Sequence, residues 1–512
     1  MTSLGALLAR KPPGYRFTIG RILAIYSGLM VTLLLAALDQ TIVATALPRI
    51  VSDLGGLSSY SWVFTAYLLA STVTVPLYGK LGDVYGRRPL FLLAIVVFLA
   101  GSALCGLAQN MPELVLFRGI QGLGAGGLFP LALAVIANVV PPADRGRYQG
   151  LIGAVFAGAS IGGPLAGGFI VDHASWRWIF YINLPVGGLA LAVISLTMPR
   201  RSARREHSID YSGAALLAAG TVALLLGLVW GGREYPWTSL QVVGALAASA
   251  ALLAAFAAVE RRAAEPILPF DLLRRKTVAA SVISISLSGM AMFGTITFVP
   301  LFVQGVIGTS ATSSGVVLTP LILGAVTTSV LSGQWISRSG RYRPNALAGP
   351  VVLTAGLVLL WRMGVGTTSG EAARNMVIAG VGVGLMMQVF VLNVQNAVPT
   401  RVMGAATALT QFSRSIGATV GVTIMGVIVN QGLPASVRSR GLGETVHRLP
   451  PHARVELAAA LRPAFLACVC IAALVFFVVV YGIEELPLRK SFEEPTLADE
   501  LGEGTEEVRQ AR

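Results

Sequence analysis

The chain has 512 residues, of which 54% are hydrophobic and only 12% charged, and its net charge is +14. With a mean hydropathy of +0.73, this composition excludes a soluble multidomain protein and indicates a protein that crosses a membrane many times. The positive charge does not predict a nucleic-acid partner, because Lys and Arg lie in short clusters between apolar runs, as topology signals do. Cys105, Cys468 and Cys470 all lie inside apolar runs, which argues against a disulfide framework or a metal site.

Residues 1–21 contain four basic residues and no acid. The apolar run that follows is too long for the core of a signal peptide, which predicts an uncleaved first span with the N-terminus in the cytoplasm. Runs of about 17 to 27 residues, long enough to cross hydrocarbon, recur fourteen times. Helices are predicted because an open strand cannot satisfy its backbone in lipid. The expected spans are 22–46, 62–78, 90–108, 114–140, 150–171, 178–198, 211–230, 240–259, 278–303, 314–336, 346–363, 376–397, 405–429 and 464–483.

An even number of spans puts both termini on one side of the membrane. Loops that this arrangement assigns to the cytoplasm carry most of the Lys and Arg residues, as the positive-inside rule requires. We therefore predict a multi-pass protein of the plasma (inner) membrane with both termini cytoplasmic, and expect a monomer in the lipid bilayer. A long outer loop is expected over residues 431–462, and residues 484–512 form an acidic tail whose composition predicts disorder.

The chain contains an internal repeat. The segment Gly79–Arg88 after the second span is echoed by Gly333–Tyr342 after the tenth, and each reads Gly, six residues, Gly-Arg. A repeat unit of six spans would place the echo after the eighth span, so two spans have been inserted between the halves. The predicted fold is all-α and divides into a cytoplasmic segment 1–21, a six-helix bundle 22–199, an inserted pair with linkers 200–276, a second six-helix bundle 277–483 and the tail 484–512.

One acidic residue lies where an acid is costly. Asp39 is the only Asp or Glu well inside a predicted span, and an ionisable group in hydrocarbon must be paired, protonated or in contact with water. Arg118 in the fourth span lies at comparable depth, within about 5 Å along the membrane normal. The pair either binds and releases a proton as its surroundings alternate between wet and dry, or forms a static ion pair between two spans.

Four segments carry the sequence of a known family. The loop after the second span has Gly79, Gly82, Asp83, Gly86, Arg87 and Arg88, the fourth span has Arg118, Gln121 and Gly122, and the fifth span has Gly158, Gly162, Gly163, Pro164 and Gly167. The first span contains Leu38–Pro48, with Ala44 where the family usually has Asn. Across nearly all of its length the chain resembles the major facilitator superfamily, and within it the fourteen-span drug/proton antiporters.

The resemblance implies proton-coupled export of amphipathic, often cationic small molecules by alternating access. Asp39 and Arg118 are then the proton-coupling residues. It implies that the loop of Asp83 latches the two halves when the cavity opens outward; the echo has Ser337 at the equivalent position, which predicts a weaker latch. Small residues recur every four positions along the fifth span, from Gly150 through Gly158 and Gly162 to Ala166. They form either a packing seam or a hinge and seal between the halves.

Polar and aromatic side chains in the spans are candidates for a central cavity. They are Trp62, Tyr67, Gln121, Phe129, Asn138, Asn183, Met292, Phe293, Gln304, Gln388, Asn393 and Gln411. Arg414, about halfway along the thirteenth span, either faces this cavity or bonds carbonyl groups of a neighbouring helix.

No phosphate-binding loop of the P-loop type and no metal-binding His pattern is present, so neither a nucleotide-driven pump nor an intramembrane enzyme is expected, and no cofactor. The remaining energy source is an ion gradient. Two alternatives to multidrug export stay open, namely a dedicated exporter of one metabolite, antibiotic or lipid, and a membrane sensor or scaffold that transports nothing.

Overall fold

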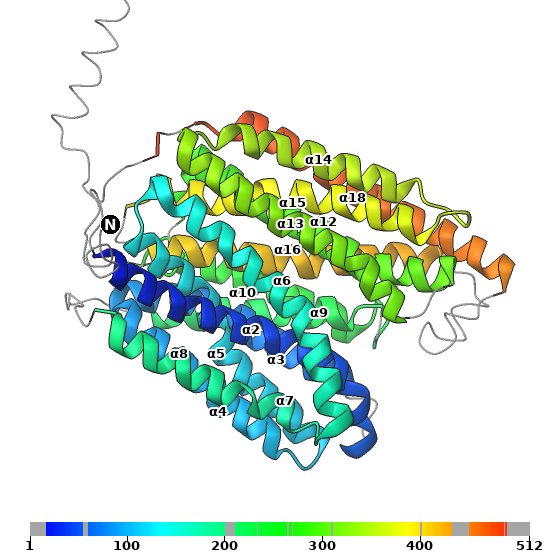
Figure 1. Ribbon diagram of the computed structural model, residues 1–512, viewed down its shortest axis with the longest axis horizontal. Coiled ribbons are helices and arrows are strands. Elements are labelled where there is room, and N and C mark those ends of the chain that lie inside the picture. The colour runs from blue at the N-terminus through cyan, green and yellow to red at the C-terminus, as the bar shows by residue number, and fades with distance from the viewer. Residues whose placement is uncertain are drawn as a thin grey trace, which may run out of the picture.

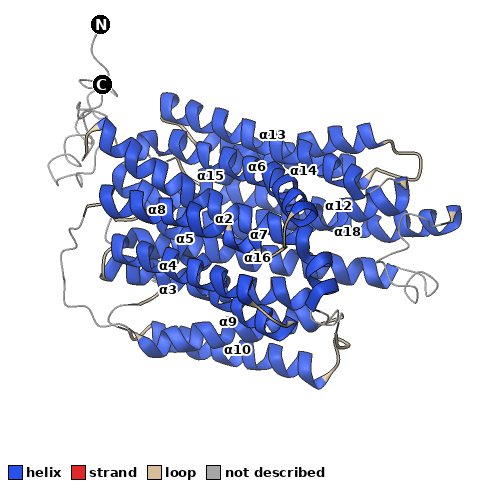
Figure 2. Ribbon diagram, turned by 60° about the horizontal axis from the view of Figure 1, so that its bottom comes forward, coloured by secondary structure: helices blue, strands red, loops and turns tan. Residues whose placement is uncertain are grey.

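The computed structural model describes residues 17–54, 60–199, 210–232, 234–263, 266–268, 270–308, 311–399, 402–432, 450–485 and 487–488. Over these residues the chain is built from helices, and the single pairing of β type is an isolated bridge between Gly231 and Tyr235. The all-α prediction is confirmed (Figure 2). Backbone groups are satisfied within each helix, as an apolar surrounding requires.

The helices follow the expected spans in order. Their bounds are α2 Ile19–Leu54, α3 Tyr60–Val84, α4 Arg87–Leu107, α5 Met111–Val139, α6 Pro142–His173, α7 Trp178–Tyr181, α8 Asn183–Thr197, α9 Tyr211–Trp230, α10 Leu240–Glu260, α11 Asp271–Arg274, α12 Lys276–Phe302, η2 Val303–Ile307, α13 Ala311–Ser339, α14 Arg343–Trp361, α15 Ser369–Ala397, α16 Met403–Gly432 and α18 Pro451–Gly482.

Among the described residues, thirteen helical stretches are long and apolar enough to cross a membrane. The short α7 and α8 count as one such stretch, as do α12 and η2. The expected tenth span forms the 29-residue helix α13, which is long enough but is not among the thirteen. The count of fourteen spans therefore stays a prediction.

Two boundaries differ from the prediction. The last helix begins at Pro451, so residues 451–462, which we expected in an outer loop, extend it; Pro is well placed there because the first turn of a helix needs no N–H from it. The expected sixth span is broken at Ile182, because Pro185 has no N–H to bond the carbonyl of Tyr181. Much of the expected outer loop, most of the acidic tail and the first linker lie outside the described residues.

Helices α2 to α8 pack on one another, and so do helices α12 to α18. The first set, blue to cyan in Figure 1, lies below the second set, which runs from green to red. The two sets meet where α13 packs on α6 and where α16 packs on α3 and α5. Helices α9 and α10 pair along one edge of the molecule (Figure 2), and α9 contacts both α3 and α16.

Candidate functional site

Asp39 and Arg118 form a buried ion pair between α2 and α5. The Nη1 atom of Arg118 lies 2.7 Å from the Oδ2 atom of Asp39, and neither side chain has any exposed surface. Two opposite charges removed from water stabilise each other only if their remaining donors and acceptors are also satisfied. The neighbours of the pair therefore decide whether this site is stable.

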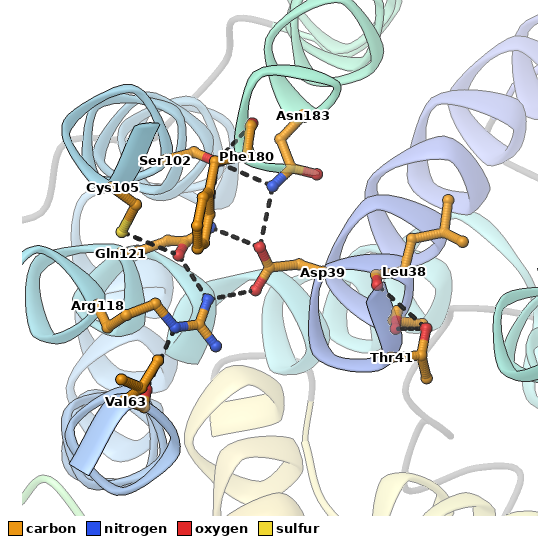
Figure 3. A network of polar contacts seen from close by, with 11 residues as sticks. Leu38, Asp39, Thr41, Val63, Ser102, Cys105, Arg118, Gln121, Phe180 and Asn183 are labelled. Carbon is orange, nitrogen blue, oxygen red and sulfur yellow. Dashed lines mark hydrogen bonds and ion pairs between the residues drawn. The ribbon is translucent and has the colours of Figure 1, made fainter. Parts of the chain in front are cut away.

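Two amide side chains complete the shell of the carboxylate (Figure 3). Gln121 Nε2 donates to Asp39 Oδ1 at 2.8 Å, and Asn183 Nδ2 donates to the same oxygen at 2.9 Å. Asn183 comes from α8, so the carboxylate ties three helices together. Ser102 of α4 accepts hydrogen bonds from both amides and donates to the carbonyl of Phe180 at 2.9 Å. The donors around Asp39, from Arg118, Gln121 and Asn183, all point at its two carboxylate oxygens, an arrangement that suits an ionised carboxylate.

The guanidinium of Arg118 is held on several sides. Its Nη1 donates to Gln121 Oε1 at 2.6 Å and its Nε to the carbonyl of Val63 at 3.3 Å. The Tyr67 ring lies 4.2 Å from the guanidinium carbon, within the range of a cation–π contact. Within the described part of the chain, Nη2 of Arg118 has no hydrogen-bond partner. One donor is thus left for an additional acceptor.

Ser102 and Val63 belong to this network, although no pattern in the sequence pointed to either residue. Ser102 is a lone hydroxyl in the apolar run of α4, and small hydroxyl residues are common at contacts between membrane helices. Val63 contributes only its carbonyl group, which no side-chain pattern reveals. Sequence reasoning identified the charged pair but not the neighbours that satisfy it.

A cavity of about 1030 Å³ lies between the two sets of helices. Helices α3, α5, α12, α15 and α16 supply most of its wall, and Trp237 and neighbouring residues of the α9–α10 connection close one side. Of the predicted lining residues, the cavity has Tyr67, Phe129, Met292, Phe293, Gln411 and Arg414. Its wall is largely aromatic and aliphatic, as in sites for drug-sized molecules.

The other predicted lining residues are not in this wall. They are Trp62, Gln121, Asn138, Asn183, Gln304, Gln388 and Asn393. Gln121 and Asn183 turn toward Asp39 instead, and Asn393 donates to Ser281 Oγ at 2.8 Å. Amide side chains in an apolar surrounding are held by the nearest charged or polar partner on another helix, so their presence in a span did not predict a cavity. Asp39 and Arg118 are also absent from the wall.

The cavity ends before one end of the bundle, where α3 and α16 meet. A Cβ atom at Gly79 would lie 2.8 Å from the carbonyl oxygen of Gly404, so the two backbones touch. Asp83 accepts the N–H groups of Gly404 and Ala405, both at 2.9 Å. These N–H groups belong to the first turn of α16, where the helix dipole favours a negative charge. Asp83 therefore caps the N-terminal end of a helix from the other set.

The rest of the Asp83 loop ties α3 to the first set of helices. Arg87 donates to Asp83 at 3.0 Å and to the carbonyl of Ala134, and Arg88 donates to the carbonyl of Ser195. Gly86 has a φ of 90°, a backbone conformation that glycine adopts without strain. Gly82 packs against α5, where a Cβ atom would lie 2.8 Å from the side chain of Leu131.

The echo of this loop makes an equivalent contact between α13 and α6. A Cβ atom at Gly333 would lie 2.1 Å from the carbonyl oxygen of Gly146, an even closer approach than that of Gly79 to Gly404. Ser337, at the position of Asp83, donates to Asp144 Oδ1 at 3.0 Å. Both copies of the repeat therefore close the same end of the bundle.

The small residues of α6 do not form one continuous seam. Gly150 packs on the backbone of Ser329, and a Cβ atom at Gly163 would meet Thr41 Oγ1 at 2.0 Å, but a Cβ atom at Gly158 or Gly162 would have no neighbour within 4 Å. The reason is geometric, because each four-residue step turns about 40° around a helix of 3.6 residues per turn. The ladder thus faces α13 at Gly150 and open space at Gly158 and Gly162, whereas the contact with α2 is made by Gly163, which lies beside the ladder. Gly167 is buried, and the side chain of Pro164 is not described.

Comparison with known proteins identifies the family. The family model described as "Major Facilitator Superfamily" matches residues 29–422. The chain is 41% identical to multidrug transporter protein MdtP of Bacillus subtilis over 404 residues, 79% of this chain and 74% of that protein. It is 40% identical to multidrug resistance protein 3 of the same organism over 401 residues, 78% of each chain.

Among solved structures, the human organic anion transporter MFSD10 superposes with a TM-score of 0.64 and 16% identity, over 92% of this chain and all of that one. At this identity the likeness shows the fold alone. The helical architecture, the family model and the Bacillus relatives agree. The chain belongs to the major facilitator superfamily of membrane transporters.

Proposed function

We propose that this chain is a proton-coupled exporter of amphipathic small molecules, in which Asp39 carries the proton. The observation behind the proposal is the Asp39 carboxylate, which is fully buried, paired with Arg118 at 2.7 Å and hydrogen-bonded to amide side chains of α5 and α8. Adding a proton to this carboxylate removes the charge that Arg118 neutralises. The contacts between α2, α5 and α8 must then rearrange.

The shape of the molecule supports transport by alternating access. On α16, which runs from Met403 to Gly432, the cavity wall extends from Gln411 to Asn430. On the antiparallel α3 it extends from Phe64 to Val75 and stops before Asp83. The cavity therefore reaches one end of the bundle, while the two repeat contacts close the other. With the loop of Asp83 in the cytoplasm, as the charge pattern predicts, this is an outward-facing state.

Tyr67 lies between the ion pair and the cavity, because its ring stacks on Arg118 and also lines the cavity wall. In this state Asp39 is 1% exposed. A proton reaches the carboxylate only when Tyr67 and Arg118 move, which couples proton binding to a change of helix packing rather than to direct contact with cargo. The multidrug transporters of Bacillus subtilis at about 40% identity favour a broad substrate range.

The test uses everted membrane vesicles that hold a respiratory proton gradient, to which amphipathic dyes of both charge signs are added. Wild-type protein is expected to dissipate the gradient as a dye enters, whereas Asp39→Asn leaves it intact. Asp53→Asn is the matched control, since Asp53 lies on the same helix in an exposed pair with Arg49 at 3.5 Å. If wild type and Asp39→Asn respond alike, Asp39 does not carry the proton.

A further inference from the structure

One charged side chain lines the cavity. Arg414 lies on α16 in the wall, 11 positions after the start of the helix at Met403 and so about 16 Å along it. In the described part of the chain, its guanidinium makes no ion pair and no hydrogen bond. The backbone of Arg414 is packed closely against α12, where a Cβ atom at Gly289 would lie 2.9 Å from the Arg414 carbonyl oxygen. The Arg414 side chain is therefore attached to a closely packed part of the cavity wall.

Among the described residues, no acidic side chain lines this cavity to balance Arg414. The polar groups of the wall are hydroxyls and amides, among them Ser288, Gln411, Ser415 and Thr419. Gln411, one turn before Arg414, has a buried Oε1 atom with no partner in the described residues. Such groups orient a ligand but do not neutralise a positive charge.

The contrast with Arg118 shows what is missing at Arg414. Arg118 has a carboxylate at 2.7 Å and further acceptors around it, whereas Arg414 has neither. A guanidinium in a largely apolar cavity is most stable with a carboxylate, sulfonate or phosphate, which its planar donors bind in pairs. A cationic ligand in the same space would meet only repulsion.

We propose that the cavity binds amphipathic organic anions, with the acidic group on Arg414 and the apolar body against aromatic rings such as Phe129, Phe293 and Phe390. This assignment rests on the proposed export function and names its substrate class. It departs from the cationic cargo that the family resemblance suggests. The anion is a free small molecule. In this outward-facing state the end of the bundle that the cavity reaches is its exit during export, and it is also the route by which an added ligand reaches the cavity in a binding experiment.

The experiment measures equilibrium binding to the purified protein in phosphatidylcholine nanodiscs. The probes are pyrenebutyrate, pyrenebutanol and pyrenebutylammonium, which share one apolar body and differ in the charge of the head group. Trp237 lines the cavity, so energy transfer from tryptophan to pyrene reports occupancy. Wild type is expected to bind the butyrate about tenfold or more tightly than the ammonium, as charge-assisted hydrogen bonds require.

Arg414→Gln is expected to abolish this preference and Arg414→Lys to retain part of it, while Arg274→Gln, which removes an exposed cation outside the cavity, leaves the preference unchanged. Because binding needs no proton gradient, the outcome is independent of whether Asp39 carries a proton. Equal or tighter binding of the ammonium by wild type would overturn the proposal even if Arg414→Gln fails to fold. Loss of pyrenebutyrate binding on adding phosphatidylglycerol to the discs would assign the site to a lipid headgroup and overturn the small-molecule assignment.

Discussion

The two copies of the repeated loop close the same end of the molecule with different chemistry. In both, a glycine of one helix touches the backbone of a glycine across the interface, Gly79 against Gly404 and Gly333 against Gly146. In the first copy, the Asp83 carboxylate also accepts hydrogen bonds from two N–H groups of α16 and forms an ion pair with Arg87. In the second copy, the side chain at the equivalent position donates one hydrogen bond to Asp144.

The difference teaches that close backbone contact and polar strength are separate parts of this seal. The glycines bring the helix ends together, which both copies need. The carboxylate of Asp83 accepts two charge-assisted bonds at a helix N-terminus and pairs with Arg87, whereas Ser337 donates one such bond to the half-buried Asp144 carboxylate. We therefore expect the contact between α3 and α16 to contribute more to closure than the contact between α13 and α6.

The largest effect is expected from Asp83→Ala. It leaves the N–H groups of Gly404 and Ala405 without their acceptor and the buried Arg87 without its partner, at a cost of about 3 to 5 kcal/mol. The closed end should then open far more often. A cysteine at Ser415 in a background without the native cysteines, labelled with an impermeant maleimide from the Asp83 side, should react much faster than in the parent. Unchanged labelling would show that Asp83 does not hold the seal.

A smaller and more even effect is expected from Gly79→Ala and Gly333→Ala. Each added methyl group meets backbone or Cβ atoms at less than 3 Å, and such overpacking costs about 1 to 3 kcal/mol. Both variants should raise the same labelling rate by similar factors. Gly158→Ala is the control, because its methyl group would have no neighbour within 4 Å. A strong effect of one glycine and none of the other would break the symmetry on which the comparison depends.

The smallest effect is expected from Ser337→Ala, which removes one hydrogen bond to the half-buried Asp144 carboxylate, worth about 1.5 kcal/mol. The labelling rate should rise by less than in Asp83→Ala, and thermal stability should change little. A rise as large as that of Asp83→Ala would mean that the two copies contribute equally and that the carboxylate adds nothing to the first.

Much of this arrangement was predictable from the residues. The order of the helices follows from the apolar runs, and the pairing of Asp39 with Arg118 follows from their depth. Asp83 follows the second predicted span, in a loop where Gly79 and Gly82 let helix ends approach closely, and this position suits contact with the end of a neighbouring helix. These features depend on hydrophobic length and on isolated charges, which a sequence displays directly.

The partners of these residues were less predictable. Gln121 and Asn183 looked like cavity residues but bind Asp39, because which neighbour an amide selects depends on how the helices are rotated against one another. Which neighbouring helix each glycine of α6 faces depends on the same rotation. Residues 451–462 extend the last helix because most of them are Ala, Leu, Glu or Arg, which are strong helix formers; their charges had placed them outside the predicted span. Sequence position alone fixes none of these.

Uphill transport by purified protein in proteoliposomes with an imposed pH gradient tests most directly whether Asp39 links proton and cargo. Wild-type protein is expected to concentrate its cargo against the cargo gradient, while Asp39→Asn should only equalise the two sides, still exchanging cargo at measurable rates. Concentration of cargo by Asp39→Asn to the wild-type ratio would contradict the account, because the driving proton would then cross without that carboxylate.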